Sequence, residues 1–172
     1  MRAAAENATP CVMELGGKSA AVVFADADLE VVMDSIDWGI FFNAGQVCSA
    51  MSRVLVHRDL YDEFLRRVVD LAESQVVGDG SDKATTMTPV ASAYQQQQVL
   101  KMCANGIKQG AELVTGGKAS NRPGYFIEPT VFTEVALGSE LFTKEVFGPV
   151  LCIASFESVS YTHLTLPTIL LV

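Results

Sequence analysis

Short runs of apolar and β-branched residues alternate in this sequence with longer segments whose apolar residues recur every three or four positions. Runs typical of strands lie at 11–15, 20–24, 54–57, 113–115, 126–132 and 150–156, of which the first two suit either two short strands or a strand and a turn. Helical spacing is found at 29–42, 61–75 and 93–109, and a polar loop covers 78–86. Strands alternating with helices predict an α/β fold with a mainly parallel sheet flanked by helices.

The composition indicates a globular chain with an acidic balance. Of its 172 residues, 49% are apolar and 19% are charged, and the formal net charge is −8. A chain of this length usually forms one domain with a genuine core. Binding to nucleic acid needs clustered cations, and the longest cluster here is the pair Arg66-Arg67. We therefore expect no nucleic-acid partner.

Signals for a membrane, a secretory route or a metal are missing from the sequence. No stretch reaches the roughly 18 consecutive apolar residues of a membrane helix, and residues 1–9 lack the apolar core of a signal peptide. We expect a cytoplasmic protein without a membrane partner. The four cysteines lie far apart with no C-x-x-C pair, so neither a zinc site nor a disulfide scaffold is predicted.

Residues 159–172 differ in character from the rest of the chain. Residues 159–168 read Val-Ser-Tyr-Thr-His-Leu-Thr-Leu-Pro-Thr, which resembles the translated read-through of an adaptor used in sequencing libraries. We therefore assign residues 1–158 to the domain and treat 159–172 as a non-native tail, excluded from fold and function. A genuine apolar strand at the C-terminus is the alternative.

Cys48 is a candidate nucleophile. It lies after a predicted helix end at 43–45 and before a predicted strand, where a loop can expose a thiol. A thiolate is a strong nucleophile that backbone dipoles or a neighbouring base can activate. The alternative is a small buried hydrophobic residue. We keep that interpretation for Cys11, Cys103 and Cys152, which lie inside apolar patterns.

Glu14 is a candidate general base. It closes an apolar run in residues 13–19, which read Met-Glu-Leu-Gly-Gly-Lys-Ser. If this run is a buried strand, loss of solvent would raise the pKa of the Glu14 carboxyl towards the range useful for a general base. A solvated edge, or a salt bridge to Lys18, is the alternative.

Three segments together resemble a known family. Residues 14–19 read Glu-Leu-Gly-Gly-Lys-Ser, residues 41–48 read Phe-Phe-Asn-Ala-Gly-Gln-Val-Cys, and residues 144–150 read Lys-Glu-Val-Phe-Gly-Pro-Val. The first two closely resemble the signature motifs of the aldehyde dehydrogenase superfamily, with 34 positions between Glu14 and Cys48. The third is similar to that family's Glu-x-Phe-Gly-Pro-Val element. The resemblance covers about residues 1–158 and implies part of the family's catalytic domain.

The resemblance implies a role for each motif residue. Cys48 matches the nucleophile that adds to the aldehyde carbonyl, and Glu14 matches the base that activates water to hydrolyse the resulting thioester. The other matches are Glu145 and Phe147 at the nicotinamide ribose, Leu15 near the nicotinamide, and Val47 and Ser49 in the aldehyde tunnel.

The resemblance also implies a small-molecule aldehyde as substrate and NAD or NADP as cofactor. The residues that distinguish these cofactors would belong to a Rossmann-type domain that the chain does not include. We expect the isolated chain to be inactive and the full-length protein to be a homo-oligomer. Residues 48–53 and 148–152 look most similar to members that act on betaine aldehyde and aminoaldehydes, whose cationic substrates an acidic or aromatic tunnel would suit.

Two other classes of function remain open at this stage. Cys48 and His57 are nine residues apart across a predicted strand and could serve a cysteine hydrolase, although no acyl-transfer signature accompanies them. Alternatively, the chain is a non-catalytic α/β interaction module in which Cys48 and Glu14 are core residues.

Overall fold

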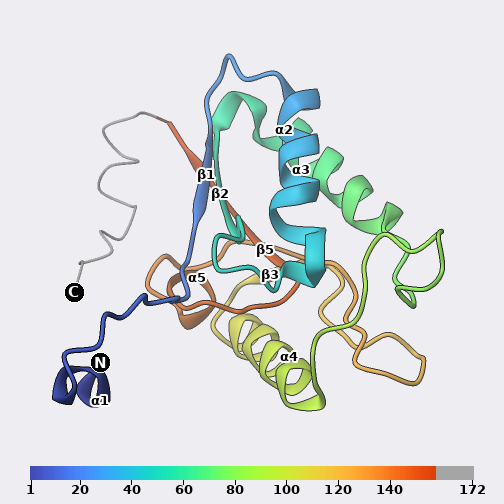
Figure 1. The fold of residues 1–172 in the computed structure, drawn as a ribbon. Coiled ribbons are helices and arrows are strands. Elements are labelled where there is room, and N and C mark those ends of the chain that lie inside the picture. Colours follow the sequence, from blue (N-terminus) through green and yellow to red (C-terminus); the bar gives the residue numbers. More distant parts are fainter. Residues whose placement is uncertain (158–172) are drawn as a thin grey trace.

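A computed structural model describes residues 1–157 (Figure 1). Its helices are α1 (Arg2–Glu6), α2 (Leu29–Ile36), α3 (Arg58–Ser74), α4 (Ala93–Lys108) and α5 (Glu140–Thr143). Its strands are β1 (Ala20–Val23), β2 (Arg53–His57), β3 (Glu112–Thr115), β4 (Thr130–Thr133) and β5 (Val150–Phe156). The tail assigned to 159–172 lies outside the described residues.

The strands form one sheet in the order β1-β2-β5-β4-β3. β1, β2, β5 and β4 are parallel to their neighbours, whereas β3 pairs antiparallel with β4. Gly116 and Gly117, which follow β3, adopt left-handed backbone angles (φ 78° and 73°) that favour glycine, and the chain reverses between Ala119 and Ile127, which form an antiparallel bridge. The predicted α/β fold with a mainly parallel sheet is confirmed.

Helices pack against this sheet and against each other. α3 contacts β2, β3, β4 and β5, and α2 lies beside α3 (Figure 1). Arg67 of α3 joins these two helices through an ion pair to Glu30 of α2 (2.5 Å), and it also pairs with Glu63 within α3 (2.7 Å). α4 contacts α5, which lies against β5 where the Cys152 thiol meets the Leu141 carbonyl (3.8 Å).

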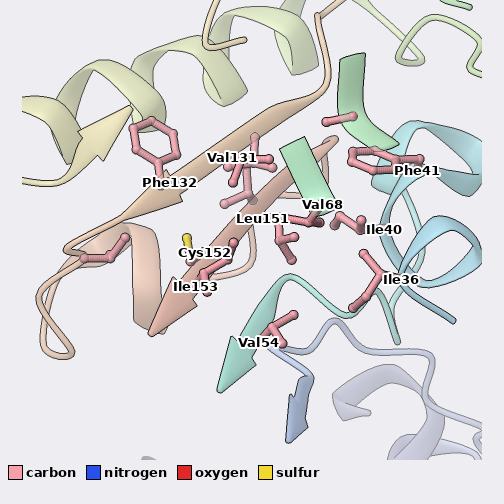
Figure 2. Close-up of a cluster of buried hydrophobic side chains, with 14 of the residues drawn as sticks. Ile36, Ile40, Phe41, Val54, Val68, Val131, Phe132, Leu151, Cys152 and Ile153 are labelled. Carbon is pink, nitrogen blue, oxygen red and sulfur yellow. The ribbon is translucent and has the colours of Figure 1, made fainter. Parts of the chain in front are cut away.

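The hydrophobic core lies between these layers (Figure 2). The core side chains that Figure 2 labels come from segments far apart in the sequence: Ile36, Ile40, Phe41, Val54, Val68, Val131, Phe132, Leu151, Cys152 and Ile153. All four residues of β4 and the first four of β5 are buried. Strands buried on both faces are typical of a parallel sheet covered by helices, which explains the continuous apolar run that begins β5.

The helix predicted for 29–42 changes character part-way. Asp28 caps α2 by accepting a hydrogen bond from the Glu30 N–H (2.9 Å), as its residue type predicts. The regular helix ends at Ile36, and a π-helical turn (Asp37–Phe41) and a 3₁₀ turn (Phe42–Gly45) follow. Ile40 and Phe41 remain buried across this change, so core packing is kept while the winding alters. Periodicity alone does not distinguish these turns from an α-helix.

Of the predicted strands, one is absent and another is shorter than expected. Residues 11–15 form no strand: the segment is open to solvent, with Val12 91% exposed, and pairs with no other strand of the described part. The strand predicted for 126–132 begins only at Thr130, because Pro129 has no N–H to donate to a strand ladder.

The parallel sheet decides where the three motifs lie. Residues 14–19 precede β1, residues 41–48 precede β2, and residues 144–150 lead into β5. These strands are neighbours in the sheet and run in the same direction. Their amino-terminal ends therefore meet at one edge, which brings the three motifs together.

Neither a membrane-spanning helix nor a metal-binding cluster is found within residues 1–157. None of the helices in 1–157 is both long and apolar enough to cross a membrane. The same stretch holds no group of three or more His, Cys, Asp or Glu side chains arranged to bind a metal ion.

Candidate active site

The first and second motifs touch through a glycine. An added Cβ on Gly17 would lie only 2.9 Å from the carbonyl oxygen of Cys48. No side chain fits at that distance, so a residue without a side chain is required where the two backbones meet. This contact places the segment that carries Glu14 beside the loop that carries Cys48.

The first and third motifs meet at the Glu145 carboxylate. The Gly17 N–H donates a hydrogen bond to Glu145 Oε1 (3.2 Å). An added Cβ on Gly16 would lie 1.9 Å from Glu145 Oε2, so both glycines form a cradle for this carboxylate. Glu145 is itself exposed to solvent, which leaves it open to a ligand.

The second and third motifs meet at Gly45. Its φ of +70° is left-handed, as expected for a helix exit, and an added Cβ would lie 2.2 Å from the Gly148 carbonyl oxygen. The left-handed conformation begins earlier than predicted, because Asn43 and Ala44 also have positive φ (51° and 52°). The glycines of all three motifs thus mark places where one backbone lies against another motif.

Side-chain amides fix the loop before Cys48. The Asn43 Nδ2 group donates to the Gln46 carbonyl (3.0 Å), and the Gln46 Nε2 group donates to the Asn43 carbonyl (2.9 Å). Gln46 Oε1 also accepts a hydrogen bond from the Ala91 N–H (2.8 Å), which anchors the loop to the segment before α4. The loop presents Cys48 at the surface, where its thiol is exposed as predicted.

Val47 and Ser49, on either side of Cys48, line a common pocket. An aromatic pair forms part of its wall, with the Trp38 and Phe42 ring centroids 5.2 Å apart. The full lining is Ser35, Trp38, Gly39, Phe42, Val47, Ser49, Ala50 and Met51. The sequence did not single out Trp38, because a lone aromatic in a helical pattern is usually a core residue.

Glu14 and Leu15 lie in the segment that precedes the Gly16-Gly17 cradle. Both side chains are exposed and the run forms no strand, so the condition for a raised pKa at Glu14 is not met and the solvated alternative applies. Within the described part of the chain, Glu14 makes no ion pair with Lys18, whose Nζ is buried without a partner. The segment approaches Cys48 at Gly17.

The third motif is held from α4. Phe147 adopts a left-handed backbone (φ 54°) and is partly exposed. The Gln95 Nε2 group donates to the carbonyls of Phe147 (2.7 Å) and Val146 (3.2 Å). Gln95 was missed from the sequence, because nothing in its helical pattern indicates a partner fifty positions away.

Comparison with known proteins identifies the family. A family model described as "Aldehyde dehydrogenase family" matches residues 1–162. The chain belongs to the aldehyde dehydrogenase family.

Individual family members are similar over nearly the whole chain. The mitochondrial aldehyde dehydrogenase of Leishmania tarentolae is 43% identical over 158 residues, covering 91% of this chain and 32% of that protein. A probable betaine aldehyde dehydrogenase of Schizosaccharomyces pombe is 41% identical over 92% of this chain and 32% of its own length. The chain therefore spans about a third of the length of the curated relatives it matches.

Solved aldehyde dehydrogenase structures share the fold. The NAD+ complex of the Bacillus cereus enzyme superposes with a TM-score of 0.91 at 39% identity, covering 95% of this chain and 33% of that one. Betaine aldehyde dehydrogenase of Staphylococcus aureus, also in complex with NAD+, gives 0.89 at 36% identity, with 95% and 33% covered. The five-stranded arrangement is thus a part of the aldehyde dehydrogenase structure.

The hydrolase alternative does not fit the geometry. His57 ends β2, whereas Cys48 precedes its first residue, so the length of the strand separates them, roughly 15 Å at about 3.3 Å per residue. The His57 imidazole instead accepts the Asp59 N–H (3.3 Å) and packs edge-on against Phe156. Interpreting Cys48 and Glu14 as core residues is also wrong, because both are exposed.

The other cysteines divide into two kinds. Cys11 is exposed, contrary to expectation, since its strand is absent. Cys103 and Cys152 are buried as predicted, and loss of solvent raises the pKa of the Cys103 thiol to about 12 and that of Cys152 to about 11. Both buried thiols stay protonated, and therefore unreactive, at neutral pH.

This division predicts the pattern of alkylation. Iodoacetamide at pH 7.5 is expected to modify Cys48 fastest and Cys11 next, and to leave Cys103 and Cys152 unmodified until urea unfolds the chain. At pH 9 Cys103 and Cys152 should still be unmodified, because burial shields them and their raised pKa values keep them almost entirely protonated. Peptide mass spectrometry measures each site. Alkylation of Cys103 in the folded chain at the rate of Cys11 would contradict the assignment.

The contact between Gly45 and Gly148 predicts a position-specific cost. Gly45→Ala should lower the free energy of unfolding by about 2–5 kcal/mol, because left-handed strain adds to a clash with backbone. Gly110→Ala is the matched control: Gly110 also has a left-handed φ (+94°), but its added Cβ meets nothing within 4 Å. The control should cost only about 1–2 kcal/mol. Equal losses in urea unfolding would show that the contact is unimportant.

Proposed function

We propose that the protein carrying these residues oxidises an aldehyde to a carboxylic acid, with hydride transfer to NAD or NADP. The observation that carries the proposal is the meeting of three motifs at the amino-terminal ends of β1, β2 and β5. Here the exposed Cys48 thiol, the segment that carries Glu14, and the two glycines that hold Glu145 lie next to one another at the surface.

Cys48 is the nucleophile of the proposed reaction. Its thiolate adds to the carbonyl carbon, a C–S bond forms, and the carbonyl oxygen becomes the oxyanion of a tetrahedral adduct. The oxyanion re-forms the carbonyl as hydride leaves the carbon, which gives an acyl thioester on Cys48. The loop fixed by Asn43 and Gln46 supports this role, because a held backbone presents the thiol in one orientation.

Glu14 is the general base that releases the product. Its carboxylate takes a proton from water, the resulting hydroxide attacks the thioester carbonyl, and the C–S bond breaks to give the acid and the Cys48 thiolate, while the proton stays on Glu14. Its support is the contact of Gly17 with the Cys48 carbonyl, which ties the Glu14 segment to the nucleophile loop.

Glu145, Phe147 and Leu15 are the cofactor residues of the proposal. A bound nicotinamide cofactor supplies the hydride acceptor. The residues present fit such a group: Glu145 offers an exposed carboxylate that can accept hydrogen bonds from ribose hydroxyls, and the Gly17 N–H holds this carboxylate beside the Cys48 loop. The NAD+ complexes of the two bacterial relatives favour NAD.

The pocket beside Cys48 would receive the aldehyde, with Val47 and Ser49 in its wall. The exposed rings of Trp38 and Phe42 could face a cationic substrate such as betaine aldehyde or an aminoaldehyde. The similarity to betaine aldehyde dehydrogenases supports this substrate class. The cytoplasmic location and the homo-oligomer stay predictions.

Removing the nucleophile should stop turnover. In the full-length protein, Cys48→Ala is expected to lower kcat by at least about a thousandfold, because no covalent adduct can form. Cofactor affinity, measured by fluorescence titration, should remain nearly unchanged. Cys11→Ala, which removes the other exposed thiol, is the control and should keep full activity. Turnover retained by Cys48→Ala would remove Cys48 from the mechanism.

Removing the base should separate the two half-reactions. Glu14→Gln is expected to give a stoichiometric burst of reduced cofactor in stopped flow, followed by steady-state turnover about 100- to 10,000-fold slower, because thioester hydrolysis loses its base. If both burst and steady state are lost, Glu14 acts before hydride transfer.

A further inference from the structure

Arg53, the first residue of β2, is a buried cation in the described core. The residue is 3% exposed. Its Nε and Nη1 atoms are buried and have no hydrogen-bond partner among the described residues. A buried guanidinium with unsatisfied donors is costly, and an apolar side chain of similar volume is often more stable in such a place. Core packing alone does not explain an arginine here.

Arg53 contacts the first motif directly and lies close in sequence or in contacts to the other two. Its Nη2 group donates to the carbonyl of Lys18, which lies in the first motif. Its guanidinium lies 5.2 Å from the ring centroid of Phe142 in α5, three residues before Glu145 of the third motif. Cys48 lies five residues before Arg53, in the loop that leads into β2.

The backbone of Arg53 repeats these links. Its N–H donates to the Ser19 carbonyl (3.3 Å), and in the sheet it pairs with Ala20 of β1 and Cys152 of β5. Next to it, the Cys152 N–H donates to the Ser52 carbonyl (3.0 Å). Arg53 therefore lies where β1, β2 and β5 begin, next to the segments that carry the three motifs.

We propose that Arg53 is a positioning residue that fixes the three motif segments relative to one another. Its planar guanidinium suits this task, because it can hydrogen-bond in its plane to the Lys18 carbonyl while its face covers the Phe142 ring. A lysine offers a single flexible ammonium and cannot do both. The alternative is that Arg53 only fills space and contributes to general stability.

Residue-resolved hydrogen exchange by NMR on the full chain distinguishes these roles. Three amides report the links between segments: those of Gly17, residue 53 and Cys152. Amides within α3 and α4 report general stability. In Arg53→Met, the three linking amides should exchange at least about tenfold faster, the factor expected for one lost hydrogen bond to a charged group, while those of α3 and α4 keep their rates.

Arg67→Met is the matched control, since it removes an arginine that joins α2 to α3 far from the motifs in sequence and contacts. It should leave the three linking amides unchanged. If Arg53→Met does not fold, Phe142→Leu keeps Arg53 and removes only the ring: the Gly17 amide, bonded to Glu145, should exchange faster, and the amide of residue 53 should not.

Uniform acceleration in α3 and α4, or no change at the linking amides, would overturn the positioning role. The view that these segments form an active site rests on the proposed function, but the hydrogen-exchange rates are measured without any aldehyde oxidation. A chain that fails to oxidise aldehydes would therefore leave the positioning result intact, and the reverse also holds.

Discussion

The parallel pairing of β1, β2 and β5 is the constraint on which the candidate site depends. Parallel neighbours start at the same edge of a sheet, so the segments that enter them must end close together in space. Each of these three strands is entered by one motif. Had one of them been antiparallel, its motif would lie at the far edge, a full strand length from the other two.

Glycine permits the close approach that this arrangement demands. Gly16, Gly17 and Gly45 each stand where an added Cβ would overlap an atom of another motif. The glycines are thus places of contact between segments more than places of local flexibility. The amide groups of Gln46 and Gln95 then bond the same loops to the segment before α4 and to α4 itself.

Polar groups in the core accompany this geometry. Lys18 and Arg53 are both buried, and loss of solvent lowers the pKa of each below its usual range. Glu145 opposes this shift at Lys18, since its negative charge favours the ammonium. Burying two cations beside the starts of three strands costs free energy, which is consistent with a role in positioning the site.

The sequence by itself determined the α/β class and the main helices, because these depend on local periodicity and capping, and its resemblance to a known family indicated the residues of the three motifs. α3, α4 and β5 lie within a few residues of their predicted bounds, and Cys48 is exposed as its loop position predicted. Only the tertiary structure decided which apolar runs became strands: residues 11–15 have a strand-like composition but pair with no strand within 1–157, and Glu14 and Cys11 are open to solvent. It also decided the parts played by Gln95, Trp38 and Arg53, whose partners are distant in sequence and come within reach only when the sheet assembles.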